Sequence, residues 1–281
     1  MRRRRARRAH RILSGIPLAA LLVGGMAWPA GFARAADRGA DGTFEQRSST
    51  HFALYQDVDI DESGGFYGSR RFEQEVLAEL ERAFESLDHL LGLRPARRID
   101  VVIYDPAAFD RQFEGLFRFQ AAGFYHGVIR IRGATRLTDA LSRVLHHELV
   151  HAALDAAAPA LIFPGWVNEG GAEWFEARAL GKRGLSGGEA AALARLSQAG
   201  ALLPLQTLNT ASFAQMGGER AQIAYLQSYA LIEHLTRSHG ERKLPQFYAE
   251  LIRTRNLDRA LERTYRLDAA ALEARFLAEL R

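Results

Sequence analysis

The stretch HHELVH at residues 146–151 restricts what this chain can fold into more than any other part of the sequence. It contains an H-E-x-x-H pattern, within a segment over 137–156 whose apolar residues recur at helical spacing. Thr138 is the expected N-cap of this helix. One face of the helix would carry Leu141, Leu145, Leu149 and Ala152, and the opposite face would carry His147 and His151. The helix must therefore bury one side and present two imidazoles, one turn apart, on the other.

His147 and His151 have the spacing that two ring nitrogens need to bind one cation at about 2.0–2.1 Å each. Glu148, next to the first histidine, is positioned to reach a metal-bound water rather than the metal. The alternative is that the three side chains line an ordinary solvated helix face. The next acidic segment bears on this choice.

The segment PGWVNEGGAEWFE at 164–176 places Glu169, Glu173 and Glu176 on one side of a predicted helix. Like charges four apart destabilise an isolated helix by roughly 0.2–0.5 kcal/mol per pair. No Lys or Arg within 164–177 offsets them, whereas a divalent cation would. An exposed acidic helix is the alternative, but it does not explain the apolar residues around the acids, which are Trp166, Val167, Trp174 and Phe175.

HELVH followed by N-E-G-G-A-E resembles the gluzincin metallopeptidases, among them the bacterial peptidase MA-like domains. The resemblance covers roughly residues 48–255. It implies one Zn²⁺ per chain, with His147, His151 and Glu169 as ligands and Glu148 as the catalytic general base. It also implies that Glu173 is the carboxylate that orients a ligating histidine, a partner that such an imidazole usually needs.

The same resemblance assigns substrate-binding positions outside the two motifs. The segment AAGFYHGVIRI at 121–131 falls where the family has an edge strand along the cleft, which binds an extended peptide by adding it to the sheet. The substrate-binding residues implied are Gly123, Phe124, Tyr125 and His126. AYLQSYALIEHL at 224–235 resembles the helix whose tyrosine donates to the developing oxyanion, with Tyr225 as first choice and Tyr229 as second. An ordinary packing role remains open for both.

Two features depart from the family pattern. The aminopeptidase branch has an acid in the edge-strand motif that holds the free amine of the substrate, and AGFYH has none. The thermolysin branch supplies a histidine to the oxyanion site, but no histidine here stands in a matching motif. The candidates are His126, His146, His234 and His239.

Residues 1–35 have the features of a secretory signal peptide: a basic start, a short apolar core and an Ala33-Arg34-Ala35 ending. Several glycines and prolines interrupt the apolar run, so an uncleaved membrane anchor is the less favoured alternative. We expect an exported protein, periplasmic or extracellular, that meets a membrane only through this segment if it stays uncleaved.

The net charge of +4 depends on that leader. Eight of the 37 Lys and Arg residues lie in 1–35, so 29 remain against 33 Asp and Glu, and the mature chain is acidic. Nucleic-acid binding is therefore not expected. The chain has no cysteine, which excludes disulfides, thiol catalysis and thiolate metal sites. We expect a monomer that acts on a peptide or protein.

The pattern along the chain changes from mixed to helical after Gly133. Residues 51–60, 99–105 and 121–133 are predicted strands, and 70–91 is a predicted helix. Further helices are predicted at 137–156, 166–180, 187–197, 219–238, 242–254 and 257–280, the last broken near Leu267-Asp268. Gly240 is the expected end of the 219–238 helix.

These elements predict an α+β, zincin-like fold. After the 1–35 leader and a 36–48 linker, one peptidase MA-like domain would span 49–281. It would consist of an α/β lobe at 49–157, with a mixed sheet and the active-site helix, followed by an all-helical lobe at 158–281.

The sequence predicts a zinc-dependent metallopeptidase in which Glu148 activates water, and it favours an endopeptidase over an aminopeptidase. Two alternatives stay open. One is a non-catalytic envelope binding protein on a peptidase-like scaffold. The other is a zinc amidase that acts on non-peptide envelope material.

Overall fold

The computed structural model describes residues 21–24, 44–58, 60, 68–118 and 120–280. Their strands are β1 (Leu21–Gly24), β2 (Glu45–Ser48), β3 (Phe52–Gln56), β4 (Ile99–Tyr104), β5 (Ala121–Tyr125) and β6 (Ile129–Arg132). Their longer helices are α2 (Gly68–Leu91), α4 (Asp139–Ala157), α5 (Gly165–Ala179), α6 (Gly187–Gln198), α8 (Gly218–His239), α9 (Lys243–Thr254) and α11 (Ala269–Glu279). The shorter ones are α3 (Pro106–Gln112), α7 (Leu205–Leu208) and α10 (Leu257–Tyr265). None of these helices is both long and apolar enough to cross a membrane.

The strands form one mixed sheet in the order β1-β5-β6-β4-β3-β2. β3, β4 and β6 run parallel to one another, β2 is antiparallel to β3, and β5 is antiparallel to β6. The expected mixed sheet and helix-rich remainder are thus present, with every described strand before residue 133.

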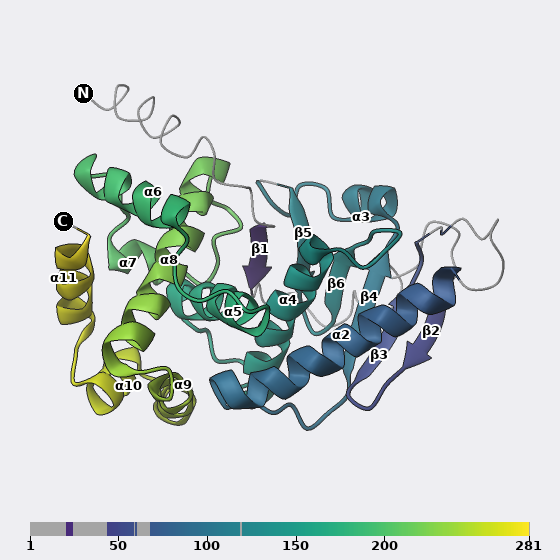
Figure 1. The fold of residues 1–281 in the computed structure, drawn as a ribbon, viewed down its shortest axis with the longest axis horizontal. Helices are drawn as coiled ribbons and strands as arrows, with labels where there is room; N and C mark the ends of the chain where they lie inside the picture. Colours follow the sequence, from purple (N-terminus) through teal and green to yellow (C-terminus); the bar gives the residue numbers. More distant parts are fainter. Residues whose placement is uncertain (1–20, 25–43, 59, 61–67, 119, 281) are drawn as a thin grey trace.

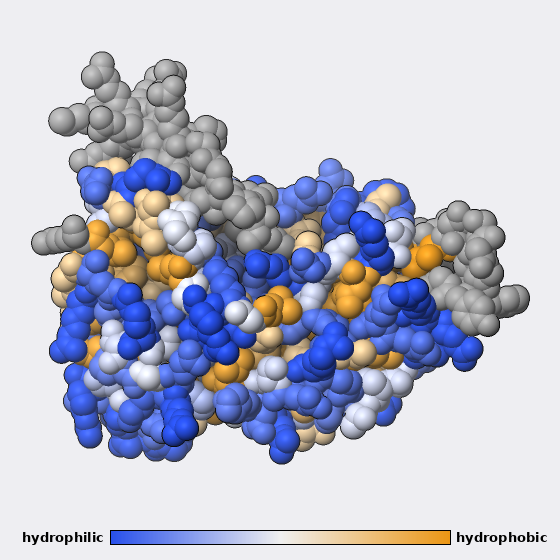
Figure 2. All heavy atoms as spheres, viewed as in Figure 1, coloured by the Kyte–Doolittle hydropathy of each residue, from blue (hydrophilic) through white to orange (hydrophobic). Residues whose placement is uncertain are grey.

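Helices α2 and α4 cover one face of this sheet (Figure 1). Alternate strand residues such as Leu54, Val101 and Ile131 point to these helices and join the large core. Side chains of the opposite parity, such as Val102, Tyr104 and Phe124, form a smaller cluster on the other face, beneath α3. The outward surface of α2 is largely hydrophilic (Figure 2), as expected for a helix that is apolar on one side only.

The large core continues from the sheet into the C-terminal helices without interruption. Its buried members extend from Phe52 in β3 to Phe276 in α11. None of the described core residues precedes Phe52.

Several helix ends follow the expected chemistry. The Thr138 hydroxyl accepts from the Leu141 backbone N–H at 3.1 Å, which confirms it as the N-cap of α4. Gly240 ends α8 with a φ of +86°. The predicted break near Leu267-Asp268 is also confirmed, because α10 ends at Tyr265 and Asp268 caps α11.

The predicted single strand over 121–133 is wrong. The segment is a hairpin in which β5 and β6 flank a turn at 126–128, with Gly127 at a φ of +70°. Apolar residues on both sides of this short turn conceal it in the sequence pattern. Two short helices, α3 and α7, were also not predicted, although Asp105 and Pro106 provide the N-cap and first position of α3.

Two segments near the N-terminus carry strands that the sequence did not predict. Residues 45–48, at the end of the expected linker, form β2. Residues 21–24, inside the expected leader, form β1, which runs parallel to β5 and lies against α4, α5 and α8. The rest of the 1–35 leader lies outside the described residues.

Candidate metal centre and active site

The candidate site lies between α4, which packs on the sheet, and α5, which follows it after a short connection. In α5 a side chain at Gly170 would collide with the Ser228 carbonyl of α8, and one at Gly171 would collide with Tyr248 of α9. These two glycines therefore let the neighbouring helices approach closely and hold α5 in place. The exposed acidic helix considered from the sequence is excluded, because Glu169 and Glu176 are buried.

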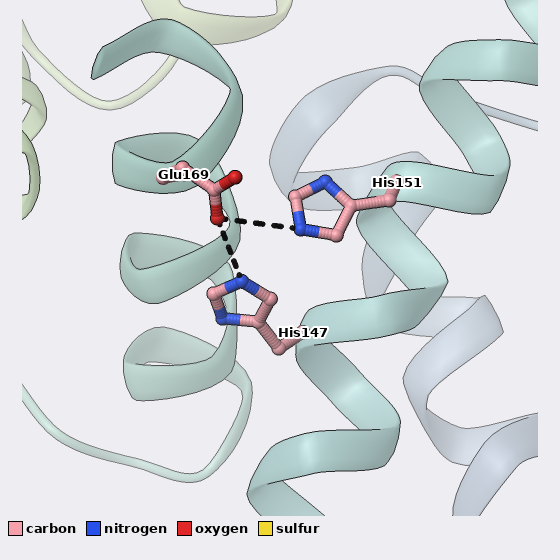
Figure 3. A group of neighbouring side chains, drawn as sticks. All are labelled: His147, His151 and Glu169. Carbon is pink, nitrogen blue, oxygen red and sulfur yellow. Dashed lines mark hydrogen bonds and ion pairs between the residues drawn. The ribbon is translucent and has the colours of Figure 1, made fainter. Parts of the chain in front are cut away.

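His147 and His151 extend from α4 toward Glu169 of α5 (Figure 3). One carboxylate oxygen of Glu169, Oε2, lies 3.3 Å from Nε2 of His147 and 3.5 Å from Nε2 of His151. All three side chains are buried. The structure thus brings together the three residues that the sequence assigned as metal ligands.

The protein fixes the opposite nitrogen of each ring. Nδ1 of His151 lies 3.0 Å from the amide oxygen of Asn168, which can only accept, so Nδ1 donates and Nε2 is the nitrogen directed at Glu169. Nδ1 of His147 faces two carboxylates, Glu176 Oε2 at 3.5 Å and Glu173 Oε1 at 4.0 Å. Both rings are therefore oriented with Nε2 directed at the site.

Glu148 is completely buried beside the histidines. Neither of its oxygens has a hydrogen bond of ordinary geometry to any described residue. Burial raises the pKa of Glu148 to about 7, although the charges of His151 and His147 and the backbone N–H of Tyr125 act against this rise. A carboxylate with a pKa near neutrality is suited to accept a proton and return it.

The pKa values of the ligand candidates reflect their mutual attraction. Burial opposes ionisation of Glu169, but the charges of His151 and His147 outweigh it and hold the pKa of Glu169 at about 2. Burial likewise lowers the pKa of His147, yet the carboxylates of Glu169 and Glu176 raise it well above its ordinary value. The Glu169 carboxylate thus stays ionised, which is the form that a metal ligand requires.

Glu173, expected to orient a ligating histidine, lies farther from His147 than Glu176 does. Burial and the charge of Glu176 raise the pKa of Glu173 to about 8. Arg143 of α4 contacts Glu176 at 3.5 Å. The negative charge of the acids in 164–177 is thus partly offset by a cation from another helix. The composition of that segment alone does not show this cation.

The two tyrosine candidates on α8 differ in their surroundings. Tyr225 is buried, and the carboxylates of Glu169, Glu173 and Glu148 contribute to a strongly raised pKa of its phenol after burial itself. Tyr229 instead donates its hydroxyl to the Gly184 carbonyl at 2.9 Å. Tyr225 is thus the tyrosine that the fold places at the site.

The predicted substrate-binding residues of β5 and the turn after it differ in where their side chains lie. A side chain at Gly123 would collide with Val144, so this glycine lets β5 approach α4. Phe124 is buried on the opposite face of the sheet, whereas Tyr125 reaches the end of α4. His126 lies in the turn after β5. The strand is not an edge of the sheet in the described structure, because β1 pairs with it.

The remaining histidine candidates lie elsewhere. His146 bonds to the Ser142 carbonyl and faces Glu79 of α2. His234 pairs with Glu279 of α11, and His239 packs on Tyr265. The sequence motifs assign no role to Asn168 or Glu176. Both stand in the quoted acidic motif, but their contacts with His151 and His147 depend on how α5 meets α4.

The donor set fits a zinc ion. Ligand atoms at 2.0–2.1 Å from a tetrahedral zinc are about 3.3–3.4 Å apart, and Glu169 Oε2 lies close to this distance from the two Nε2 atoms, at 3.3 Å from His147 and 3.5 Å from His151. Nε2 of His151 is buried with no hydrogen bond of ordinary geometry to a described residue. Two imidazoles and one carboxylate are a set typical of catalytic zinc.

Comparison with solved structures finds an M1 zinc metallopeptidase from Deinococcus radiodurans, a mutant crystallised with a Tyr-Ser-Ala substrate. The identity is 16%, the TM-score is 0.45, and the similarity covers 84% of this chain and 52% of that one. The chain thus spans about half the length of that protein. No curated protein matches the sequence.

The model of the peptidase MA superfamily matches residues 80–281, which include α4, α5 and α8 and make up well over half of the chain. The chain belongs to the peptidase MA superfamily.

Proposed function

We propose that this protein is an exported zinc-dependent metallopeptidase that hydrolyses peptide bonds. The observation that carries the proposal is the buried group of His147, His151 and Glu169, whose donor atoms have the spacing of a zinc site. Membership in the peptidase MA superfamily supports the same activity. The leader at 1–35 is the basis for export.

His147, His151 and Glu169 would hold one Zn²⁺ per chain. When bound, the ion supplies Lewis acidity, which polarises a carbonyl and lowers the pKa of water toward neutrality. Glu148 accepts the proton of the attacking water and later gives it to the leaving amine. Its pKa of about 7 favours both transfers near neutral pH.

Tyr225 is the candidate for stabilising the developing oxyanion. Its phenol remains protonated at any physiological pH, because burial and three carboxylates raise its pKa. A hydroxyl that cannot ionise remains a donor, and one such donor contributes a factor of about 10²–10³ to turnover.

The outer edge of β5 is the proposed binding strand for an extended peptide, with Gly123, Phe124, Tyr125 and His126 along it. The pairing of β1 with β5 supports this, because it demonstrates that this edge can accept a further strand. Backbone hydrogen bonds along the edge would bind the middle of a long chain, which favours an endopeptidase.

Cleavage of a peptide library by the zinc-loaded protein tests the proposal. The wild type should cut peptide bonds, and Glu148→Gln should lower turnover by a factor of about 10²–10⁴ with zinc still bound, since general-base catalysis contributes that much. Glu114→Gln, at an exposed position, is the matched control. Equal rates in Glu148→Gln would contradict the mechanism. No cleavage by the zinc-loaded wild type would favour the binding scaffold or the amidase.

A further inference from the structure

The metal-site face of α4 continues to the surface of the protein. His147, His151 and Asp155 follow one another at intervals of four residues, so they lie along one side of the helix. The two histidines are buried, whereas Asp155 is exposed. Four helical residues rise about 6 Å, so the exposed Asp155 lies roughly one turn beyond the buried His151.

Tyr125 of β5 holds Asp155 in place. Its hydroxyl donates to Oδ2 of Asp155 at 2.8 Å. Burial and the Asp155 carboxylate raise the pKa of Tyr125, so the phenol remains a donor. The backbone N–H of the same residue acts on the Glu148 carboxylate. One residue of the proposed binding strand thus links the general base to Asp155.

The carboxylate of Asp155 has no cationic partner among the ion pairs of the described chain. The last turn of α4 contains no basic residue. The C-terminal end of a helix carries a partial negative charge that favours cations and disfavours acids. Arg130, the cation nearest along the hairpin, donates to the carbonyls of His126 and Val128 and lies over Phe124 on the opposite face. The protein thus gives the Asp155 carboxylate the Tyr125 hydroxyl as a donor, but no cationic partner among the described residues.

We propose that Asp155, oriented by Tyr125, binds a positive charge of the substrate about two residues from the scissile bond. The inference rests on the proposed peptidase function and adds a substrate class to it. An extended peptide advances about 3.3 Å per residue, so two residues span the rise from His151 to Asp155. The group bound is an ammonium or guanidinium, supplied by a Lys or Arg side chain or by the free amino terminus.

Peptide affinity measured on a catalytically inactive variant tests this inference independently of turnover. The probe protein is the zinc-loaded chain without residues 1–35, which keeps every described core residue, with Glu148→Gln. The ligands are octapeptides of alanine and phenylalanine that carry one lysine at each position in turn, or norleucine as the neutral match. Each is made with a free and with an acetylated amino terminus, and affinity is measured by calorimetry.

A lysine at one position should bind about tenfold more tightly than norleucine, as expected for a charge-assisted hydrogen bond. Asp155→Asn should abolish the difference, and Asp155→Lys should reverse it in favour of the norleucine peptides. Asp139→Asn, at the exposed start of the same helix, should keep it. If acetylation of the amino terminus weakens binding, whereas replacement of lysine by norleucine does not, the bound cation is the free amine.

A purely structural link between β5 and α4 gives a different result. Asp155→Asn and Tyr125→Phe would then weaken the binding of lysine and norleucine peptides equally, which would overturn the inference. Charge-dependent binding without any cleavage by the wild type would contradict only the peptidase function. Cleavage and binding that ignore peptide charge would contradict only the role of Asp155.

Discussion

At the scale of single residues, His147 and His151 are oriented by groups on the side away from Glu169. The amide oxygen of Asn168 accepts from Nδ1 of His151, and Glu176 and Glu173 face Nδ1 of His147. Each contact determines which nitrogen is available to a metal. The residues that bind and those that orient thus come from the same two helices.

Asn168→Ala should weaken zinc binding while leaving the three ligands in place. Without the amide oxygen, the His151 ring loses its preferred tautomer, and loss of such a partner costs about 10–100-fold in metal affinity. The measurement is competition with a chromophoric chelator. Asn209→Ala, which removes a comparable bond to Trp166 outside the site, is the control. Equal zinc affinity in the wild type and Asn168→Ala would refute this role.

The ligand assignment could be made from the sequence, because the spacing within HELVH and WVNEGGAE is local. The parts of the site that depend on how helices meet could not. Glu176 lies nearer to His147 than the expected Glu173, and Arg143 reaches Glu176 from the preceding helix. The sequence pattern does not separate Tyr225 from Tyr229, whereas in the fold Tyr225 faces the carboxylates and Tyr229 bonds to the Gly184 carbonyl.

At the scale of elements, the close contact of α5 with α8 positions Glu169. Gly170, next to it, meets the backbone of Ser228, and no flexible side chain is available there to give way. The site therefore depends on a helix contact that tolerates no added carbon.

Gly170→Ala should lower the free energy of unfolding by about 1–3 kcal/mol, as expected for overpacking, and reduce zinc binding. Gly188→Ala is the matched control, because nothing lies near an added Cβ in α6 and alanine favours a helix. Thermal unfolding and zinc content of both variants provide the measurement. Equal stability of Gly170→Ala and wild type would contradict the packing argument.

Strand β1 occupies the edge of β5 that the proposed function assigns to the substrate. We therefore expect the chain with residues 1–35 to cleave peptides more slowly than the chain without them. The comparison is initial rates for the two zinc-loaded forms, with equal zinc content as the control. A chain that is equally active with its leader would show that β1 does not block the edge.

The sequence predicted the long helices well and the strands less well. Helices such as α4 and α8 have several turns of periodic apolar residues and marked ends, Thr138 and Gly240. The hairpin of β5 and β6 was predicted as one strand, because each strand is short and the turn between them keeps apolar neighbours. β2 was not predicted, because its residues EQRS are polar and it is the last strand of the sheet.

At the scale of the whole molecule, one core joins the sheet to the C-terminal helices, and the candidate zinc site lies within that junction. A metal held by His147, His151 and Glu169 would connect α4 to α5. The acidic charge of residues 36–281 is consistent with a protein that binds a peptide cation and not nucleic acid.

Removal of zinc by a chelator should lower the melting temperature and leave the helical content unchanged at 25 °C. Free zinc at 1,000 times its dissociation constant stabilises the folded state by about 4 kcal/mol. At roughly 2–4 °C per kcal/mol for a domain of this size, the shift is about 10 °C. Magnesium, which prefers oxygen ligands, should not restore it. A melting temperature that is the same with and without zinc would contradict binding of zinc to the folded state.

Zinc content of the purified protein, measured by mass spectrometry of metals beside Glu169→Ala, tests the central claim most directly. The account predicts about one zinc per chain in the wild type and a large loss in the variant, because two imidazoles alone bind weakly. A wild type without zinc after reconstitution, or a variant that retains all of it, would contradict the assignment of His147, His151 and Glu169 as a metal centre.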